Sequence, residues 1–170
     1  MAVGDTIAGR FVLGRLAGRG GMGPVYHAED RVAGGRVAVK LLDGRASVDA
    51  ARFEREARVL DGLVHPNVVR YVDHGVASDG RAYLAMEWLE GAPLDTWLRG
   101  RTPTVAESLA IVAGAARGLG AAHARGIVHR DVKPANLFLV ERDPGRVKVI
   151  DFGIARDVSA GHTLTQSGAV

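Results

Sequence analysis

The sequence predicts an α+β fold, with short strands in the first half of the chain and helices prominent in the second. Strand signals alternate with turns over residues 10–42 and return at residues 81–88. Helical periodicity covers residues 47–63, and a capping box at Thr104 and Glu107 opens a longer helix that ends near Gly126. Strands grouped in one half of a chain, rather than alternating regularly with helices, favour α+β over α/β.

Length and composition allow a buried core and exclude several classes of function. The 170 residues are 47% hydrophobic, and 22 basic against 19 acidic residues leave a net charge of +3 that is too scattered to indicate nucleic acid binding. The chain has no cysteine, which excludes disulfides, thiolate metal sites and cysteine nucleophiles. No apolar run approaches the roughly 18 to 20 residues of a membrane span, and the N-terminus is not a signal peptide. We therefore expect a cytoplasmic chain with no membrane segment.

A glycine-rich segment follows the first predicted strand. Residues 18–25 fit the pattern G-x-G-x-x-G-x-V, which taken alone is shared with dinucleotide-binding folds. A dinucleotide-binding unit continues into a helix, whereas residues 25–30 continue as a second strand. Strand, glycine loop and strand place flexible backbone amides over phosphate groups, although Pro24 removes one of those amides.

The third strand and the helix after it each carry a charged residue on an otherwise apolar face. Alternation along residues 36–42 puts Ala38 and Lys40 on the face opposite Val37, Val39 and Leu41. The helix at residues 47–63 repeats apolar residues at helical spacing, and that stripe consists of Phe53, Glu56, Ala57 and Leu60. An inward carboxylate needs a cationic partner.

The long helix predicted after Thr104 carries an apolar stripe and several glycines. The stripe comprises Leu109, Val112, Ala113, Ala116, Leu119 and His123. Gly114, Gly118 and Gly120 each destabilise a helix interior by about 1 kcal/mol relative to alanine. Their presence predicts close packing against a neighbouring element, with His123 packed in the core.

Two short polar segments bounded by strands hold the most reactive side chains. Residues 129–136 read His-Arg-Asp-Val-Lys-Pro-Ala-Asn, and residues 151–153 read Asp-Phe-Gly. An aspartate to accept a hydroxyl proton, an asparagine and a second aspartate to hold Mg²⁺, and a lysine to neutralise phosphate are the groups that phosphoryl transfer requires. The chain has only three lysines: Lys133 falls in the first of these segments, Lys40 lies on the third predicted strand, and Lys148 lies just before the second segment.

The sequence thus resembles the eukaryotic-like serine/threonine protein kinases, in a bacterial form. The glycine loop, the V-A-V-K of residues 37–40, H-R-D-x-x-x-x-N and D-F-G match in order. The resemblance implies a five-stranded antiparallel first lobe at residues 1–88 and an incomplete, mainly helical second lobe at residues 89–170. It also implies truncation after the start of the activation loop, because no A-P-E segment follows.

The resemblance implies a role for each matching residue. Asp131 would be the catalytic base, Lys133 would stabilise the transferring phosphate, and Lys40 would pair with Glu56. Asn136 and Asp151 would hold Mg²⁺. ATP would contact the glycine loop, the hinge backbone and the floor of the cleft, namely Gly18, Gly20, Gly23, Val25, Ala38, Lys40, Glu87, Leu89 and Phe138. His129, Phe152, Leu60 and Tyr71 would form an internal hydrophobic stack.

The implied activity is transfer of the ATP γ-phosphate to a serine or threonine hydroxyl of a protein substrate. Arg130 suggests regulation by a phosphate on the following loop, and a kinase homodimer would place that phosphate on Thr165 or Ser167. The first alternative is a nucleotide-binding regulatory or dimerisation module without turnover. A small-molecule phosphotransferase of the same fold is a second alternative.

Overall fold

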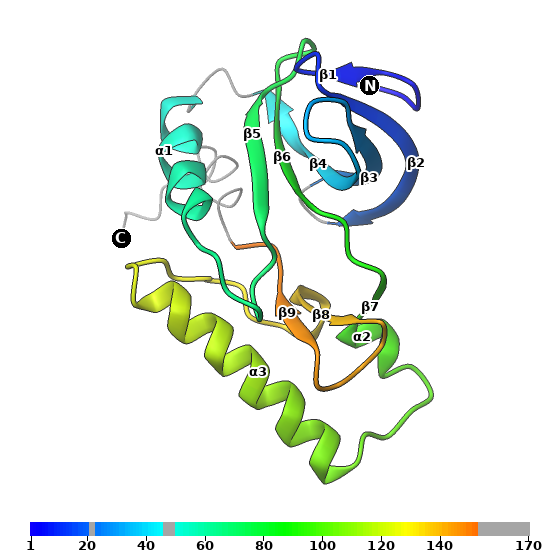
Figure 1. Cartoon of the computed structure of the whole chain (residues 1–170), viewed down its shortest axis with the longest axis vertical. Coiled ribbons are helices and arrows are strands. Elements are labelled where there is room, and N and C mark those ends of the chain that lie inside the picture. Colours follow the sequence, from blue (N-terminus) through cyan, green and yellow to red (C-terminus); the bar gives the residue numbers. More distant parts are fainter. Residues whose placement is uncertain (21–22, 46–49, 153–170) are drawn as a thin grey trace, which may run out of the picture.

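The computed structural model describes residues 1–20, 23–45 and 50–152, with the backbone alone at 44–45, 50–52 and 56. Figure 1 shows a curled sheet and one helix packed above a smaller sheet and a long helix. The elements are β1 (Thr6–Ile7), β2 (Phe11–Gly20), β3 (Gly23–Asp30), β4 (Arg36–Arg45), α1 (Ala50–Asp61), β5 (Tyr71–Val76), β6 (Arg81–Glu87), β7 (Gly91–Pro93), α2 (Leu94–Trp97), α3 (Val105–His123), the 3₁₀ turn η2 (Pro134–Asn136), β8 (Leu137–Val140) and β9 (Val147–Val149).

The larger sheet has six strands in the order β1-β2-β3-β4-β6-β5, and every neighbouring pair is antiparallel. Strands β2 to β6 form the expected five-stranded antiparallel sheet. The two-residue β1 adds a sixth strand at the edge, which was not expected because two residues are too few to show an alternating pattern. The β2–β3 pairing shifts register between Leu13 and Leu16 and again before Gly18, and such bulges increase strand twist and bending. Figure 1 shows the resulting curl of the sheet at β2 and β3.

The two faces of β4 bury different side chains, as the alternation of its residues predicted. Val37, Val39 and Leu41 pack on one face with the cluster that includes Phe11 and Tyr83. On the other face Ala38 and Leu42 belong to the cluster that contains the buried side of α1. That side consists of Phe53, Ala57 and Leu60, each at most 2% exposed, as expected. The side chain of Glu56 lies outside the described residues.

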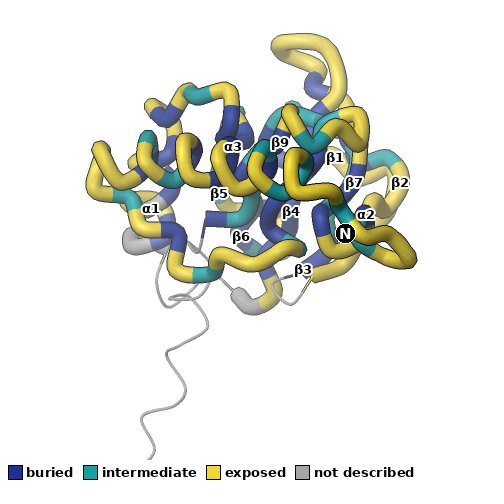
Figure 2. The backbone as a smooth tube through the Cα atoms, turned by 90° about the horizontal axis from the view of Figure 1, so that it is seen from below, coloured by how far each residue is buried: buried dark blue, intermediate teal, exposed yellow. Residues whose placement is uncertain are grey.

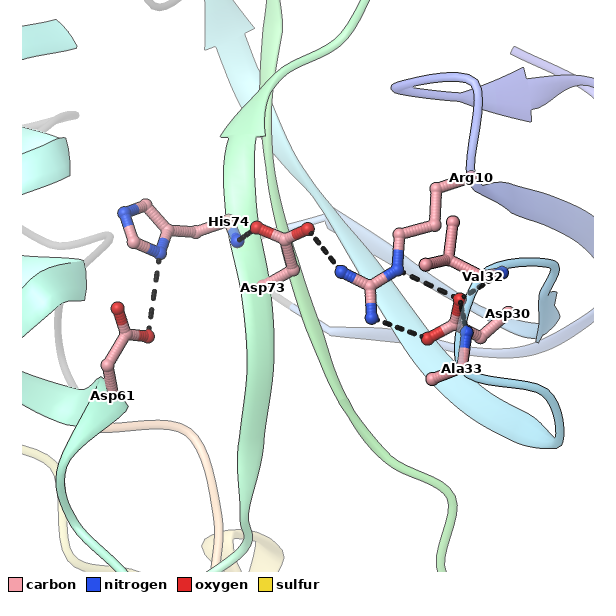
Figure 3. Close-up of polar contacts among 7 residues, drawn as sticks. All are labelled: Arg10, Asp30, Val32, Ala33, Asp61, Asp73 and His74. Carbon is pink, nitrogen blue, oxygen red and sulfur yellow. Dashed lines mark hydrogen bonds and ion pairs between the residues drawn. The ribbon is translucent and has the colours of Figure 1, made fainter.

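A series of polar contacts links β3, β5, α1 and the turn before β2 (Figure 3). The guanidinium of Arg10 donates twice to the buried carboxylate of Asp30, at 2.8 and 2.7 Å, and once to Asp73 on β5 at 2.9 Å. The neighbour of Asp73, His74, lies 3.8 Å from Asp61 at the end of α1. The arginine side chain keeps the pKa of the Asp30 carboxyl well below its ordinary value.

The smaller sheet, in the order β7-β8-β9, lies against α3. The Thr104–Glu107 capping box is present at the start of the helix, as predicted. The predicted apolar stripe of α3 is wrong except at Leu119, which packs against the core. Leu109 and Val112 are both 65% exposed, and His123 is also exposed. Figure 2 shows long exposed stretches along this helix. The packed face is made instead of smaller residues, and its members are Ile111, Gly114, Ala115, Gly118 and Ala122.

Two glycines of α3 explain this reversal. A Cβ on Gly118 would lie 2.4 Å from the backbone oxygen of Asn67, and one on Gly114 would lie 2.4 Å from a methyl group of Val147. The helix therefore presents a face whose glycines and alanines allow close approach, while Leu109 and Val112 point outward. By length and composition α3 is apolar enough to span a membrane, contrary to the expectation from the sequence, but here the face with these glycines packs on β9.

The segment between α1 and β5 joins the two parts of the molecule. Asn67 donates its side-chain amide to the Val147 oxygen at 2.8 Å, and its own backbone oxygen accepts from Val149 N–H at 2.9 Å. Val69 N–H donates to the Val149 oxygen at 3.0 Å. The first lobe is thus hydrogen bonded to β9, the strand that leads to Asp151.

Candidate active site

A cavity of about 620 Å³ lies between the curled sheet and the polar segments that contain Asp131 and Asp151. Glycine-loop backbone forms one side of it, and residues of the second lobe form the other. Its lining is Gly18, Arg19, Gly20, Val25, Lys40, Pro93, Asp95, Thr96, Asp131, Lys133, Ala135, Asn136 and Asp151. Side chains that are more than one hundred residues apart in the sequence, such as Lys40 and Asp151, therefore meet in one cleft.

Asp131 is held by contacts with two neighbours on the same loop. The ammonium of Lys133 lies 2.9 Å from Oδ2 of Asp131. The side-chain nitrogen of Asn136 donates to the Asp131 backbone oxygen at 2.8 Å and to Oδ2 at 3.2 Å. The loop thus folds back so that its acid, its ammonium and its carboxamide face a common point.

Lys40 reaches the same cavity from the opposite lobe. Its side chain is 4% exposed, and its Nζ lies 2.9 Å from Oδ2 of Asp151, whose side chain is 28% exposed. A buried ammonium is stable as a cation only beside negative charge. Lys40 and Asp151 therefore supply one positive and one negative group at the place where phosphate oxygens and a cation would meet.

The oxygen atoms near Asp151 fit a magnesium ion. Mg²⁺ prefers oxygen ligands and is usually held by one or two carboxylates together with substrate phosphates. Both hydrogen bonds of the Asn136 carboxamide use its nitrogen, so its oxygen is the atom that can act as a ligand. Asp151 and Asn136 line the same cavity and offer one carboxylate and one neutral oxygen.

A second cavity of about 360 Å³ adjoins the first and shares Gly18, Val25, Pro93 and Asp151 with it. It is more apolar, and Ala38 and Met86 on one side with Phe138 on the other form walls suited to a flat ring. Glu87, Trp88 and Leu89 line its edge where β6 ends. The two cavities together form one elongated cleft with an apolar end and a charged end.

His129 and Phe152 pack together beneath the charged end. Their ring centroids lie 4.7 Å apart, and both side chains are buried. Nδ1 of His129 accepts from Asp131 N–H at 3.3 Å, so the proton sits on Nε2, which donates to the Ile150 oxygen at 2.9 Å. One histidine thus connects the backbones of the segments that carry Asp131 and Asp151.

Tyr71 belongs to the same buried cluster, together with Leu60. Burial, with a smaller effect from the Asp151 carboxylate, raises the pKa of the Tyr71 hydroxyl, and a hydrogen bond with the Phe152 backbone acts in the opposite direction. The tyrosine is therefore neutral and contacts the residue that follows Asp151.

Arg130 and Asp151 adopt left-handed backbone conformations, with φ of 62° and 57°. Such conformations destabilise a non-glycine residue by about 1 to 2 kcal/mol, and they concentrate at functional sites. Arg130 directly precedes Asp131, and Asp151 is itself a lining residue of the cavity, so at both places the backbone turns sharply to present a carboxylate. Packing and hydrogen bonds in the rest of the fold must offset the cost of these two conformations.

Most predicted site residues line the cleft, including Gly18, Gly20, Val25, Ala38 and Leu89. Gly23 does not line it. A Cβ at Gly23 would lie 2.0 Å from the Leu41 oxygen, so this glycine allows β3 and β4 to approach each other closely. Thr165 and Ser167 lie outside the described residues. Asp95 on α2 lines the cleft without having been predicted, and its place shortly after the hinge residues Glu87 and Leu89 is the signal that could have indicated it.

A fold of this kind, with a glycine loop over a cleft that holds Lys40, Asp131, Asn136 and Asp151, defines the protein kinase class. The sequence model of the protein kinase domain matches residues 11–169, and the chain belongs to this family. The chain is 44% identical over 168 residues to the serine/threonine-protein kinase Pkn1 of Myxococcus xanthus, covering 95% of this chain and 24% of that protein. It is 43% identical over 177 residues to PknA of Mycobacterium tuberculosis, covering 99% of this chain and 40% of that protein.

Solved structures agree with the sequence relatives. The Mycobacterium tuberculosis PknI kinase domain superposes with a TM-score of 0.80 at 37% identity, over 91% of this chain and 62% of that chain. Rad53 residues 1–466 in complex with AMP-PNP give a TM-score of 0.77 at 27% identity, over 88% of this chain and 40% of that chain. The chain thus spans about a quarter to two fifths of the lengths of the curated relatives named here.

Proposed function

We propose that this chain carries the catalytic groups of a serine/threonine protein kinase that uses ATP and Mg²⁺. The observation that carries the proposal is the single cleft lined by Lys40, Asp131, Lys133, Asn136 and Asp151. The relatives named serine/threonine-protein kinases support the reaction class, and the AMP-PNP complex of Rad53 supports an adenine nucleotide in the cleft.

In the proposed reaction, the substrate hydroxyl oxygen attacks the γ-phosphorus of ATP. The new oxygen–phosphorus bond forms as the bond to the β-phosphate oxygen breaks, ADP leaves, and Asp131 accepts the hydroxyl proton. Lys133 and Lys40 stabilise the negative charge of the phosphate oxygens. Asn136 and Asp151 would hold Mg²⁺, which neutralises phosphate charge when bound.

The same proposal covers several further features. The first lobe would comprise residues 1–88 and the second residues 89–170, with the base bound by the backbone of Glu87 and Leu89. A second copy of the chain would phosphorylate Thr165 or Ser167. A cytoplasmic location is inferred from the need for ATP.

Intact mass spectrometry after incubation with Mg-ATP tests the proposal, using peptides that carry a single Ser, Thr or Tyr. We expect phosphate on the Ser and Thr peptides or on the chain itself. Asp151→Asn abolishes transfer, whereas the control Asp143→Asn, which changes an exposed turn carboxylate in the same way, does not. Full activity of Asp151→Asn would contradict the mechanism. Nucleotide binding without any transfer would favour the regulatory module instead.

A further inference from the structure

A partly buried ion pair links β9, the strand that leads to Asp151, to Glu87 at the base-binding end of the cleft. Nζ of Lys148 on β9 donates to Oε1 of Glu87 at 2.7 Å, and the side chains are 19% and 22% exposed. We propose that Glu87 and Lys148 are positioning residues that hold Asp151 in register with the base-binding end of the cleft. This inference rests on the proposed function, because it concerns how the cleft binds the base and the phosphates of one nucleotide at the same time.

At the base end, Glu87 is fixed by more than the lysine. Its Oε1 also accepts from Arg70 N–H at 2.8 Å, and its own backbone N–H donates to the Arg70 oxygen at 2.9 Å. Charge-assisted hydrogen bonds of this kind are about twice as strong as neutral ones. The carboxylate is therefore a rigid anchor at the edge of the apolar cavity that Glu87 lines.

On β9, Lys148 is fixed by more than one contact as well. Its Nζ donates to the Val68 oxygen at 3.2 Å in addition to Glu87. The backbone of the next residue, Val149, is hydrogen bonded to Asn67 and Val69. Both the side chain and the main chain of β9 are thus attached to the first lobe just before Asp151.

Lys148 is attached to the first lobe only three positions before Asp151, so this attachment affects where the Asp151 carboxylate lies. Three residues of extended backbone span at most about 10 Å, so a displacement at Lys148 passes almost directly to the Asp151 carboxylate. A misplacement of about 1 Å in a reacting group can reduce a rate on the order of 100-fold. A compact ammonium with three donors can serve a carboxylate and a carbonyl together, which gives a reason for one of the three lysines in the chain to stand here.

Titration calorimetry with adenosine and with Mg-ATP tests the inference on the full chain. Adenosine occupies only the base end, whereas Mg-ATP needs Asp151 as well. For Lys148→Met we expect adenosine affinity within about twofold of wild type and Mg-ATP affinity about 10-fold weaker, the change expected when a partly buried charged contact is lost. Glu87→Gln, which keeps the backbone and an acceptor for Arg70, should produce the same selective loss.

The control is Arg10→Met, which removes another partly buried ion pair far from the cleft. It should lower thermal stability but leave the ratio of the two affinities unchanged. Equal weakening of both ligands in Lys148→Met, or no weakening, would overturn the inference; if that variant does not fold, Glu87→Gln decides in the same way. Failure of the wild type to bind either ligand would overturn the proposed function and this inference with it.

Discussion

Replacing two glycines of α3 by alanine should change stability in opposite directions. At Gly120 an added Cβ meets no atom within 4 Å, so alanine gains about 1 kcal/mol from its higher helix propensity. At Gly118 the same gain is opposed by a Cβ 2.4 Å from the Asn67 oxygen and 3.1 Å from a methyl group of Val149. Overpacking of this kind destabilises by about 1 to 3 kcal/mol, and the contact here is with backbone, which moves least easily.

Urea denaturation followed by circular dichroism measures the difference. We expect the free energy of unfolding to rise by about 1 kcal/mol in Gly120→Ala and to fall by about 1 to 2 kcal/mol in Gly118→Ala, with unchanged m-values. Gly114→Ala should lie between them, because the 2.4 Å contact there is with a side-chain methyl group of Val147. If Gly118→Ala proved as stable as Gly120→Ala, the close packing of α3 on Asn67 would be refuted.

Two further predictions concern stability. The Arg10 side chain lowers the pKa of the Asp30 carboxyl below its ordinary 3.8. The stability that the Arg10–Asp30 ion pair contributes is therefore present above about pH 4 and is lost as the pH falls below that. Unfolding free energies measured between pH 5 and pH 3 should therefore fall less steeply in Arg10→Met, and an unchanged slope would contradict this. Thr104→Ala removes the side chain that caps α3 and should lower the melting temperature, corresponding to about 1 kcal/mol, whereas Thr96→Ala on α2, which has no capping bond, should change it less.

The sequence was most informative where one local rule decides the outcome. Alternation along β4 predicted correctly that Ala38 and Lys40 share a face, because the strand is buried on both sides by different clusters. Helical spacing along α1 predicted correctly that Phe53, Ala57 and Leu60 are buried, because they lie on the one side of the helix that packs against the core. The segments at residues 129–136 and 151–153 were recognisable as those of the protein kinase family, because phosphoryl transfer requires particular residue types in a particular order.

The sequence was least informative where packing depends on the absence of side chains. The buried face of α3 was mispredicted because Leu109 and Val112 were counted as core, while Gly114 and Gly118 carry no hydropathy signal of comparable size. Which side chain lies nearest Lys40 also depends on the placement of β9 against the first lobe, and no short-range pattern encodes that placement. The structure pairs Lys40 with Asp151, and the expected partner Glu56 stays a prediction.

The two tryptophans give the molecule an intrinsic optical reporter. Trp88 is half-buried at the edge of the apolar cavity, beside the rings and charges of His27, Arg15 and Glu90. Trp97 is buried on α2 with the Arg101 guanidinium 4.1 Å from its ring centroid. Indole emission depends on the polarity around the ring. A ligand at the base end would therefore change the emission of Trp88, which lines that cavity, more than the emission of Trp97, which does not. No attached dye would be needed.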